Sequence, residues 1–191
     1  MKKVLFVFLC LYVFGIQAKA QLSSDQPLKI SILDESISLP NTWFLDYSFN
    51  PAIMVGTEIT LKSNPKNAFF LSGDLGFYHH KGIQSALVFN LGLGYRQEIG
   101  RLYASLRLGP GYSHIFTASQ IYEYENGEYV EKGDLGRPTF SPFIALEVGY
   151  ALSSKAQRPE LFLTMIESVD INAVTFPHQF VGLGLKFYPF Q

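Results

Sequence analysis

The sequence predicts an all-β fold, an eight-stranded antiparallel transmembrane β-barrel that follows a cleaved signal peptide. Three observations predict it. Apolar residues alternate with small or polar residues along most of the chain, which is the period of a β-strand. Only 16% of the residues are charged, against roughly 25% in a typical soluble domain, although the chain holds 17 phenylalanines and 11 tyrosines. Finally, the connections at one end of the predicted barrel are short or moderate, and most of those at the other end are long.

The N-terminus has the pattern of a secretory signal peptide. Two lysines precede an unbroken apolar run over residues 4–16, and Ala18 and Ala20 stand where a signal peptidase reads small residues. At about 1.5 Å per residue this run covers roughly 20 Å, short of the roughly 30 Å of a bilayer core, so we do not expect an anchor helix. We therefore expect cleavage before Gln21.

This cleavage divides the chain into a signal peptide, residues 1–20, and one barrel domain, residues 21–191. The only cysteine, Cys10, lies in the signal peptide. The mature chain is therefore expected to have no disulfide, no thiolate metal site and no thiol nucleophile. The net charge of the full sequence, -1, without a basic run, argues against nucleic-acid binding.

The alternation is clearest between Leu87 and Arg96. Leu87, Leu91 and Tyr95 fall on an apolar face, whereas the opposite face is small or polar. The same pattern recurs along the chain, and no mature segment is apolar over the length of a transmembrane helix. We predict strands at residues 28–34, 53–62, 68–78, 85–98, 102–114, 140–152, 160–167 and 179–189. Residues 41–49 are an alternative first strand or a hairpin arm in the outer loop.

The less apolar face carries isolated charges among glycines. A narrow membrane barrel needs such an interior, with small residues where space is tight and opposite charges that pair across the lumen. The alternative is a soluble sheet with charges facing solvent. The predicted barrel-interior charges are three acids and three bases: Glu58, Asp74, Arg96, Arg107, Glu147 and Lys186.

The connections differ in length according to the end of the barrel at which they lie. The second, fourth and sixth (63–67, 99–101 and 153–159) are short or moderate, and the third (79–84) is also short. The first, fifth and seventh (35–52, 115–139 and 168–178) are long. Short turns at the periplasmic end and longer surface loops are typical of outer-membrane barrels with both termini inside. This pattern predicts location in the cell outer membrane.

Several motifs resemble known outer-membrane proteins. The segment VGLGLKFYPFQ at the C-terminus resembles the last strand of outer-membrane barrels, which their insertion machinery recognises. GDLGFYHH, LGYR and DLGRP resemble a group of small, uncharacterised outer-membrane β-barrels with a porin-like label, over about residues 50–190. In size and strand number the chain is also similar to the barrel of outer-membrane protein A and to eight-stranded lipid A-modifying enzymes. The resemblance implies contact with outer-membrane lipid, lipopolysaccharide and the insertion machinery, but no activity.

All four histidines are predicted at the outer rim, where a polar interface suits imidazole. They are His79, His80, His114 and His178. Their spacing fits no metal motif, so we expect no metal site and no cofactor. Ser113 lies beside His114, but consecutive strand residues point to opposite faces, so we predict no catalytic triad.

The fifth connection is the largest candidate binding surface. Asn126-Gly127 between alternating residues is a strong signal for a two-residue β-hairpin. Its acids could attract cations or a basic partner, and Arg137 could pair with Asp134 at the loop base. The surface-loop candidates are Glu123, Glu125, Glu128, Glu131, Asp134 and Arg137.

These observations predict a small outer-membrane β-barrel with a narrow or filled lumen and a structural or surface-interaction role. One alternative is a barrel enzyme that modifies outer-leaflet lipid, similar to a lipid A deacylase. Another is a secreted lipocalin-like barrel that binds an apolar ligand, which requires an apolar interior and a polar exterior.

Overall fold

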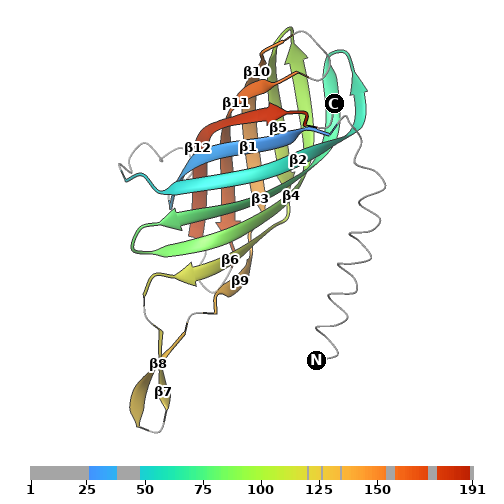
Figure 1. The fold of residues 1–191 in the computed structure, drawn as a ribbon. Helices are drawn as coiled ribbons and strands as arrows, with labels where there is room; N and C mark the ends of the chain where they lie inside the picture. Colours follow the sequence, from blue (N-terminus) through green and yellow to red (C-terminus); the bar gives the residue numbers. More distant parts are fainter. Residues whose placement is uncertain are drawn as a thin grey trace.

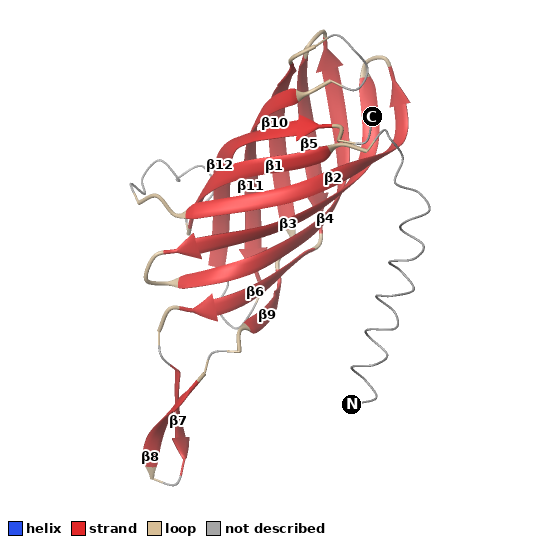
Figure 2. Ribbon diagram, viewed as in Figure 1, coloured by secondary structure: helices blue, strands red, loops and turns tan. Residues whose placement is uncertain are grey.

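The computed structural model of the chain describes residues 26–37, 48–119, 121–125, 127–133, 135–153, 158–171 and 176–189. The predicted signal peptide, residues 41–47 of the alternative first strand, Asn126, Asp134 and the last two residues lie outside the described part. No helix of the described residues is long and apolar enough to cross a membrane. Figure 2 shows that strands dominate the described part.

The described strands form one closed antiparallel barrel, as predicted. Neighbouring segments are paired in sequence order, and the first strand closes the barrel against the last. Ten segments make eight barrel strands, because β5 and β6 continue one strand and β9 and β10 continue another (Figure 1). The segments are β1 (Leu28–Ser36), β2 (Pro51–Asn64), β3 (Asn67–His80), β4 (Gln84–Ile99), β5 (Leu102–Gly109), β6 (Gly111–Thr117), β9 (Arg137–Phe140), β10 (Phe143–Ala151), β11 (Glu160–Asp170) and β12 (Phe176–Phe187).

The first strand occupies the place that the sequence predicted, and it is slightly longer. Leu28 pairs with Phe187 at one end of the closing seam, and Ser36 pairs with Gln179 at the other. The alternative first strand over residues 41–49 is therefore wrong, since β1 holds that position between β12 and β2. The last strand begins at Phe176, before the predicted residue 179.

Two barrel strands are interrupted at prolines that the prediction ran through. Leu108 pairs with Leu93 before the break and Gly111 pairs with Asn90 after it, so the pairing stays in step across Pro110. Proline has no N–H and cannot complete a ladder bond. Pro142 interrupts the neighbouring strand between β9 and β10 for the same reason. The barrel strand predicted over residues 140–152 also starts earlier, at Arg137, where β9 pairs with β6.

The two ends of the barrel differ. We call the turn end the one that holds the β2–β3 and β4–β5 turns and the start of β1. We call the loop end the one that holds the β3–β4 turn and the chain that leaves β6. From the loop end a separate two-stranded ribbon, β7 (Ile121–Glu125) and β8 (Glu128–Lys132), projects beyond the barrel (Figure 1).

Large apolar side chains cover the outside of the barrel. Leu91 and Leu93 on β4 are 50% and 52% exposed, and every barrel strand contributes similar residues. Small and polar side chains fill the inside, in the alternation that the sequence predicted. In lipid a closed barrel satisfies every backbone polar group, and its apolar exterior replaces the usual buried core as the surface in contact with hydrocarbon. A lipocalin-like barrel needs the opposite arrangement, which excludes that alternative.

Glycines make room for aromatic rings inside the barrel. Phe70 pairs with Gly94, and a Cβ atom on that glycine would lie 2.3 Å from the phenylalanine ring. Tyr103 packs over Gly149 in the same way. Each ring thus covers a cross-strand glycine and fills the lumen without widening the barrel.

Candidate functional site

Charged side chains form a buried layer in the turn-end half of the lumen, which we call the charge layer. Glu147 on β10 accepts hydrogen bonds from Lys29 Nζ at 2.8 Å and from the Tyr103 hydroxyl at 2.9 Å. Glu58 on β2 binds Lys186 Nζ at 2.8 Å and Arg96 at 3.0 Å. The layer comprises four acids and four bases: Lys29, Glu58, Asp74, Arg96, Arg107, Glu147, Glu160 and Lys186.

Aromatic rings complete this layer. The Arg96 guanidinium lies 4.2 Å from the centre of the Tyr103 ring, and Lys29 Nζ lies 5.2 Å from the centre of the Phe162 ring. Such contacts stabilise a cation that has lost its water. Because a buried charge without partners is costly, the matched number of acids and bases lets these side chains remain charged inside the barrel.

An apolar layer separates the charge layer from the loop end. It includes Leu33, Met54, Phe143, Ile166 and Phe180, all buried in one cluster. The rings and branched side chains come from strands on all sides of the barrel, so they meet across its axis. Apolar side chains cannot replace the hydration shell of an ion, so this layer is unfavourable to an ion inside the described lumen.

A second polar cluster closes the loop end, which we call the histidine network. Glu35 on β1 joins two histidines: one carboxylate oxygen lies 2.7 Å from His80 Nδ1, and the other lies 2.6 Å from His178 Nδ1. The other ring nitrogen of His178 lies 3.1 Å from Asp170 on β11. Asp170 accepts a hydrogen bond from Ser141. The network therefore ties β1, β3, β11 and β12 together.

The remaining two histidines face outward at the loop end. His79 Nδ1 lies 2.8 Å from Ser85 Oγ, and His114 Nδ1 lies 2.9 Å from the Tyr112 hydroxyl. Ser113 points into the lumen, where its hydroxyl oxygen lies 2.8 Å from that of Ser141. Ser113 and His114 thus lie on opposite faces. No group of three or more potential metal ligands in the described part could hold a metal ion.

The ribbon of β7 and β8 follows the predicted hairpin. Tyr124 pairs with Tyr129 beside the turn, and their ring centroids lie 5.1 Å apart in an edge-to-face arrangement. The tyrosines are 64% and 75% exposed, and Glu128 is exposed as well. Arg137, at the base of the loop, is also exposed. The backbone places Glu123, Glu125 and Glu131 in this ribbon, whereas Asp134 lies outside the described residues.

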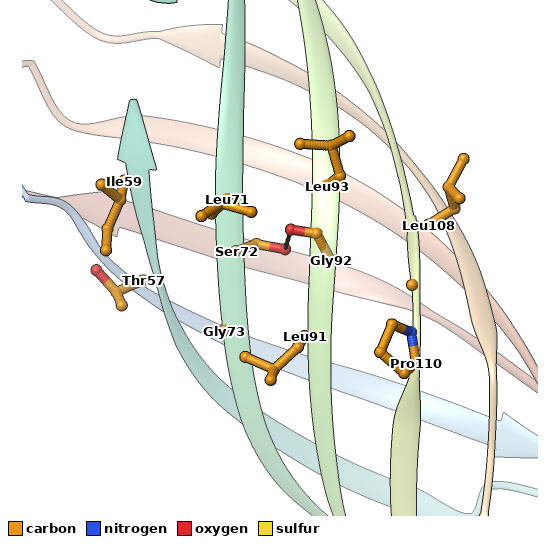
Figure 3. A pocket seen from close by; sticks show the side chains of 11 residues that line it. Thr57, Ile59, Leu71, Ser72, Gly73, Leu91, Gly92, Leu93, Leu108 and Pro110 are labelled. Carbon is orange, nitrogen blue, oxygen red and sulfur yellow. Dashed lines mark hydrogen bonds between the residues drawn. The ribbon is translucent and has the colours of Figure 1, made fainter. Parts of the chain in front are cut away.

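A hollow interrupts the apolar outer surface midway between the two ends, and we call it the outer groove. It has a volume of about 580 Å³ and crosses β2, β3, β4 and the β5–β6 break (Figure 3). Ile59, Leu71, Leu93 and Leu108 line its turn-end side. The groove exists because Gly73, between Thr57 and Leu91 in the outward row, contributes no side chain.

The structure also identifies interior residues that the sequence analysis missed. All six predicted interior charges are buried, but Lys29 and Glu160 join them. Their positions follow from the alternation, since Ile30 and Leu161 beside them face outward. Glu35 and Asp170 were assigned to loops, although each lies on a strand that extends further than predicted.

Comparisons with known proteins address the fold. No protein-family model matches the sequence, and no curated protein matches it. Among solved structures, Neisserial surface protein A matches with a TM-score of 0.53 at 6% identity, over 86% of this chain and 97% of that chain. The N-terminal β-barrel domain of Pseudomonas aeruginosa OprF matches at 0.51 and 11% identity, over 84% and 96%. The outer membrane enzyme PagL matches at 0.50 and 9% identity, over 84% and 98%.

These likenesses show a common fold, that of small outer-membrane β-barrels. The resemblance stated from the sequence motifs is confirmed at this level. Strand closure and the apolar exterior agree with this comparison: the chain has the fold of a small outer-membrane β-barrel.

Proposed function

We propose that this protein is a non-porous barrel that holds a protein-binding ribbon at the cell surface. In the proposed orientation the turn end faces the periplasm and the loop end faces outward, as the sorting of short and long connections favours. We also infer that residues 1–20 direct export and that the insertion machinery recognises β12.

The observation that carries this proposal is the exposed Tyr124–Tyr129 pair on a ribbon that pairs with no barrel strand. Tyrosine supplies a large, rigid contact area at low entropic cost, which is why it is enriched at protein interfaces. Four glutamates against one lysine in β7 and β8 favour a basic partner. The two outer edges of the ribbon leave room for an added strand.

The test replaces residues 121–132 with a short glycine–serine turn and measures binding of a lysine-rich peptide to the barrel in lipid nanodiscs. We expect salt-sensitive binding to the intact protein and its loss on ribbon removal. The matched variant, Tyr124→Ser with Tyr129→Ser, keeps the charges of the ribbon. We expect it to weaken peptide binding strongly in high salt and only slightly in low salt. Equal binding with and without the ribbon would refute the proposal. Faster gel migration before boiling would verify that each barrel is folded.

A barrel enzyme acting on outer-leaflet lipid is the second candidate. The contact between His79 and Ser85 on the outer surface favours it, since a serine beside an imidazole is the minimal arrangement for acyl transfer. No carboxylate among the described residues is hydrogen-bonded to His79, which weakens the case. If Ser85 is a nucleophile, lipid A from cells expressing Ser85→Ala will differ in mass from wild-type lipid A; identical spectra would exclude the enzyme.

A further inference from the structure

The outer groove has the shape and chemistry to hold a single hydrocarbon chain. Its lining is almost entirely apolar, and it lies in the zone of the barrel where the surrounding medium is lipid. Two rows of outward side chains bound it. Ile59, Leu71, Leu93 and Leu108 form the turn-end row, and Val55, Leu75 and Phe89 form the next outward row toward the loop end.

The floor between these rows is low because of two residues. Gly73 pairs with Thr57 on one side and Leu91 on the other, so its missing side chain opens the row. Pro110 continues this floor at the β5–β6 break (Figure 3). A second barrel meets a barrel wall along a convex surface and fills such a furrow poorly. A flexible acyl chain can follow it and restore the dispersion contacts that an empty hollow loses.

Charged and polar groups mark one end of the same strands as a headgroup site. Lys62 on β2 is exposed and pairs with the outward Phe69, whose ring lies 5.0 Å from that of Tyr95. The Tyr95 hydroxyl accepts a hydrogen bond from Asn67 and donates one to Gln97, both at 2.9 Å. Lys66 is exposed in the β2–β3 turn. Within the described part of the chain, neither lysine forms an ion pair with a carboxylate.

Two free cations beside an aromatic girdle fit a phosphate at the membrane interface. The groove lies about five residues along β3 from this end, and strands rise about 3.3 Å per residue, so an acyl chain can reach from the lysines to Gly73. We infer that the outer groove binds one acyl chain of a phospholipid from the periplasmic leaflet, whose phosphate contacts Lys62 and Lys66. The choice of leaflet rests on the proposed orientation; the groove itself does not.

The test uses native mass spectrometry of the full-length mature protein with palmitoyl-oleoyl phosphatidylglycerol in detergent micelles. Gly73→Leu fills the groove, and its Cβ would meet only Leu91, at an ordinary 3.7 Å, so the barrel should fold. We expect this variant to lower the lipid-bound fraction about tenfold, through the lost contact of a few methylene groups. Leu163→Phe, which enlarges an exposed residue of β11 on the far side of the barrel, is the matched control and should retain lipid.

A second variant tests the headgroup. Lys62→Gln with Lys66→Gln should lower the retention of phosphatidylglycerol by about thirtyfold, since each lysine near an anionic surface contributes about 1 kcal/mol. Unchanged retention in Gly73→Leu would overturn the groove. If Gly73→Leu loses lipid and the lysine variant retains it, the inference that the lipid comes from the periplasmic leaflet is wrong. A change from dimer to monomer in Gly73→Leu would identify the groove as a contact between copies and would also overturn the inference.

Discussion

Glu147 is the residue on which the charge layer depends most. It is 1% exposed, and its carboxylate contacts Lys29, Lys186, Arg107 and the Tyr103 hydroxyl. Glu147→Gln removes one negative charge and leaves a net positive charge inside the barrel. We expect the free energy of unfolding to fall by about 3–5 kcal/mol. Urea titration of the folded and unfolded gel bands measures this change.

The control restores the charge balance. Lys29→Met removes a base that bonds both Glu147 and Glu58, so adding it to Glu147→Gln again leaves equal numbers of acids and bases. The double variant should lose less stability than the sum of the two single variants, because the residues share one network. Additive losses would show that Glu147 and Lys29 do not depend on each other.

For single residues, the sequence predicts which face of the sheet a side chain points to, but not which residue it contacts. Alternation alone assigns Glu58, Arg96 and Glu147 to the same face, because side chains of a strand point alternately to its two sides. It cannot tell that Glu58 binds Lys186, since these residues lie on β2 and β12 and meet only through the curvature of the closed sheet. Closure likewise brings Glu35 to His80 and His178.

At the scale of elements, the seam between β1 and β12 relies on the histidine network at its loop end. Glu35 accepts from both His80 and His178, and a glutamine there cannot accept from both. Glu35→Gln should speed amide hydrogen exchange about tenfold near Ser36 and Gln179, through more frequent local opening. The paired turn-end residues Lys29 and Lys186 serve as the internal reference, and faster exchange there as well would argue against a local role for Glu35.

The strands also show which features the alternation of apolar residues predicts and which it does not. Strong alternation located β3 and β4 nearly to their ends. The sequence analysis did not predict the breaks at Pro110 and Pro142. Each proline fits the apolar pattern of its own strand, and its missing N–H affects only the pairing with the neighbouring strand. The hairpin at Gly127, where φ is 93°, was predictable because the turn chemistry is local.

For the whole molecule, the apolar exterior makes a direct prediction about membrane insertion. Leu91 faces outward near mid-height, so Leu91→Arg places a charge in the bilayer core and should cost about 2–4 kcal/mol. Folding into vesicles, followed by gel migration, measures this cost. Arg101, already exposed at the turn end, gives the contrast: Arg101→Leu should change stability by less than about 1 kcal/mol. A small effect of Leu91→Arg would place this wall away from lipid.

The three stacked layers of the lumen predict that the barrel does not conduct. The apolar layer that includes Met54, Phe143 and Phe180 lies between two polar clusters, so water cannot form a continuous column. In planar bilayers we expect no single-channel steps from purified protein. Phe143→Ala with Phe180→Ala is the positive test, because it removes two rings from the apolar layer and should raise the frequency of steps. Conductance by the wild-type protein would contradict the filled lumen.

The whole-molecule architecture was accessible from sequence, because composition, alternation and connection lengths each report on the solvent around the chain. The ligand chemistry was not. The outer groove arises from Gly73 and Pro110, which strand pairing sets in one row on either side of Leu91, and no local sequence pattern predicts that arrangement.

The self-contained pairing of β7 with β8 makes the barrel a ready carrier for foreign sequence. A peptide inserted at Gly127 would extend the ribbon at its tip, and the pairing of β6 with β9 would keep its register. In the proposed orientation such an epitope would stand clear of lipopolysaccharide sugars nearest the membrane. Vaccine antigens or affinity tags could then be displayed on living cells without redesign of the scaffold.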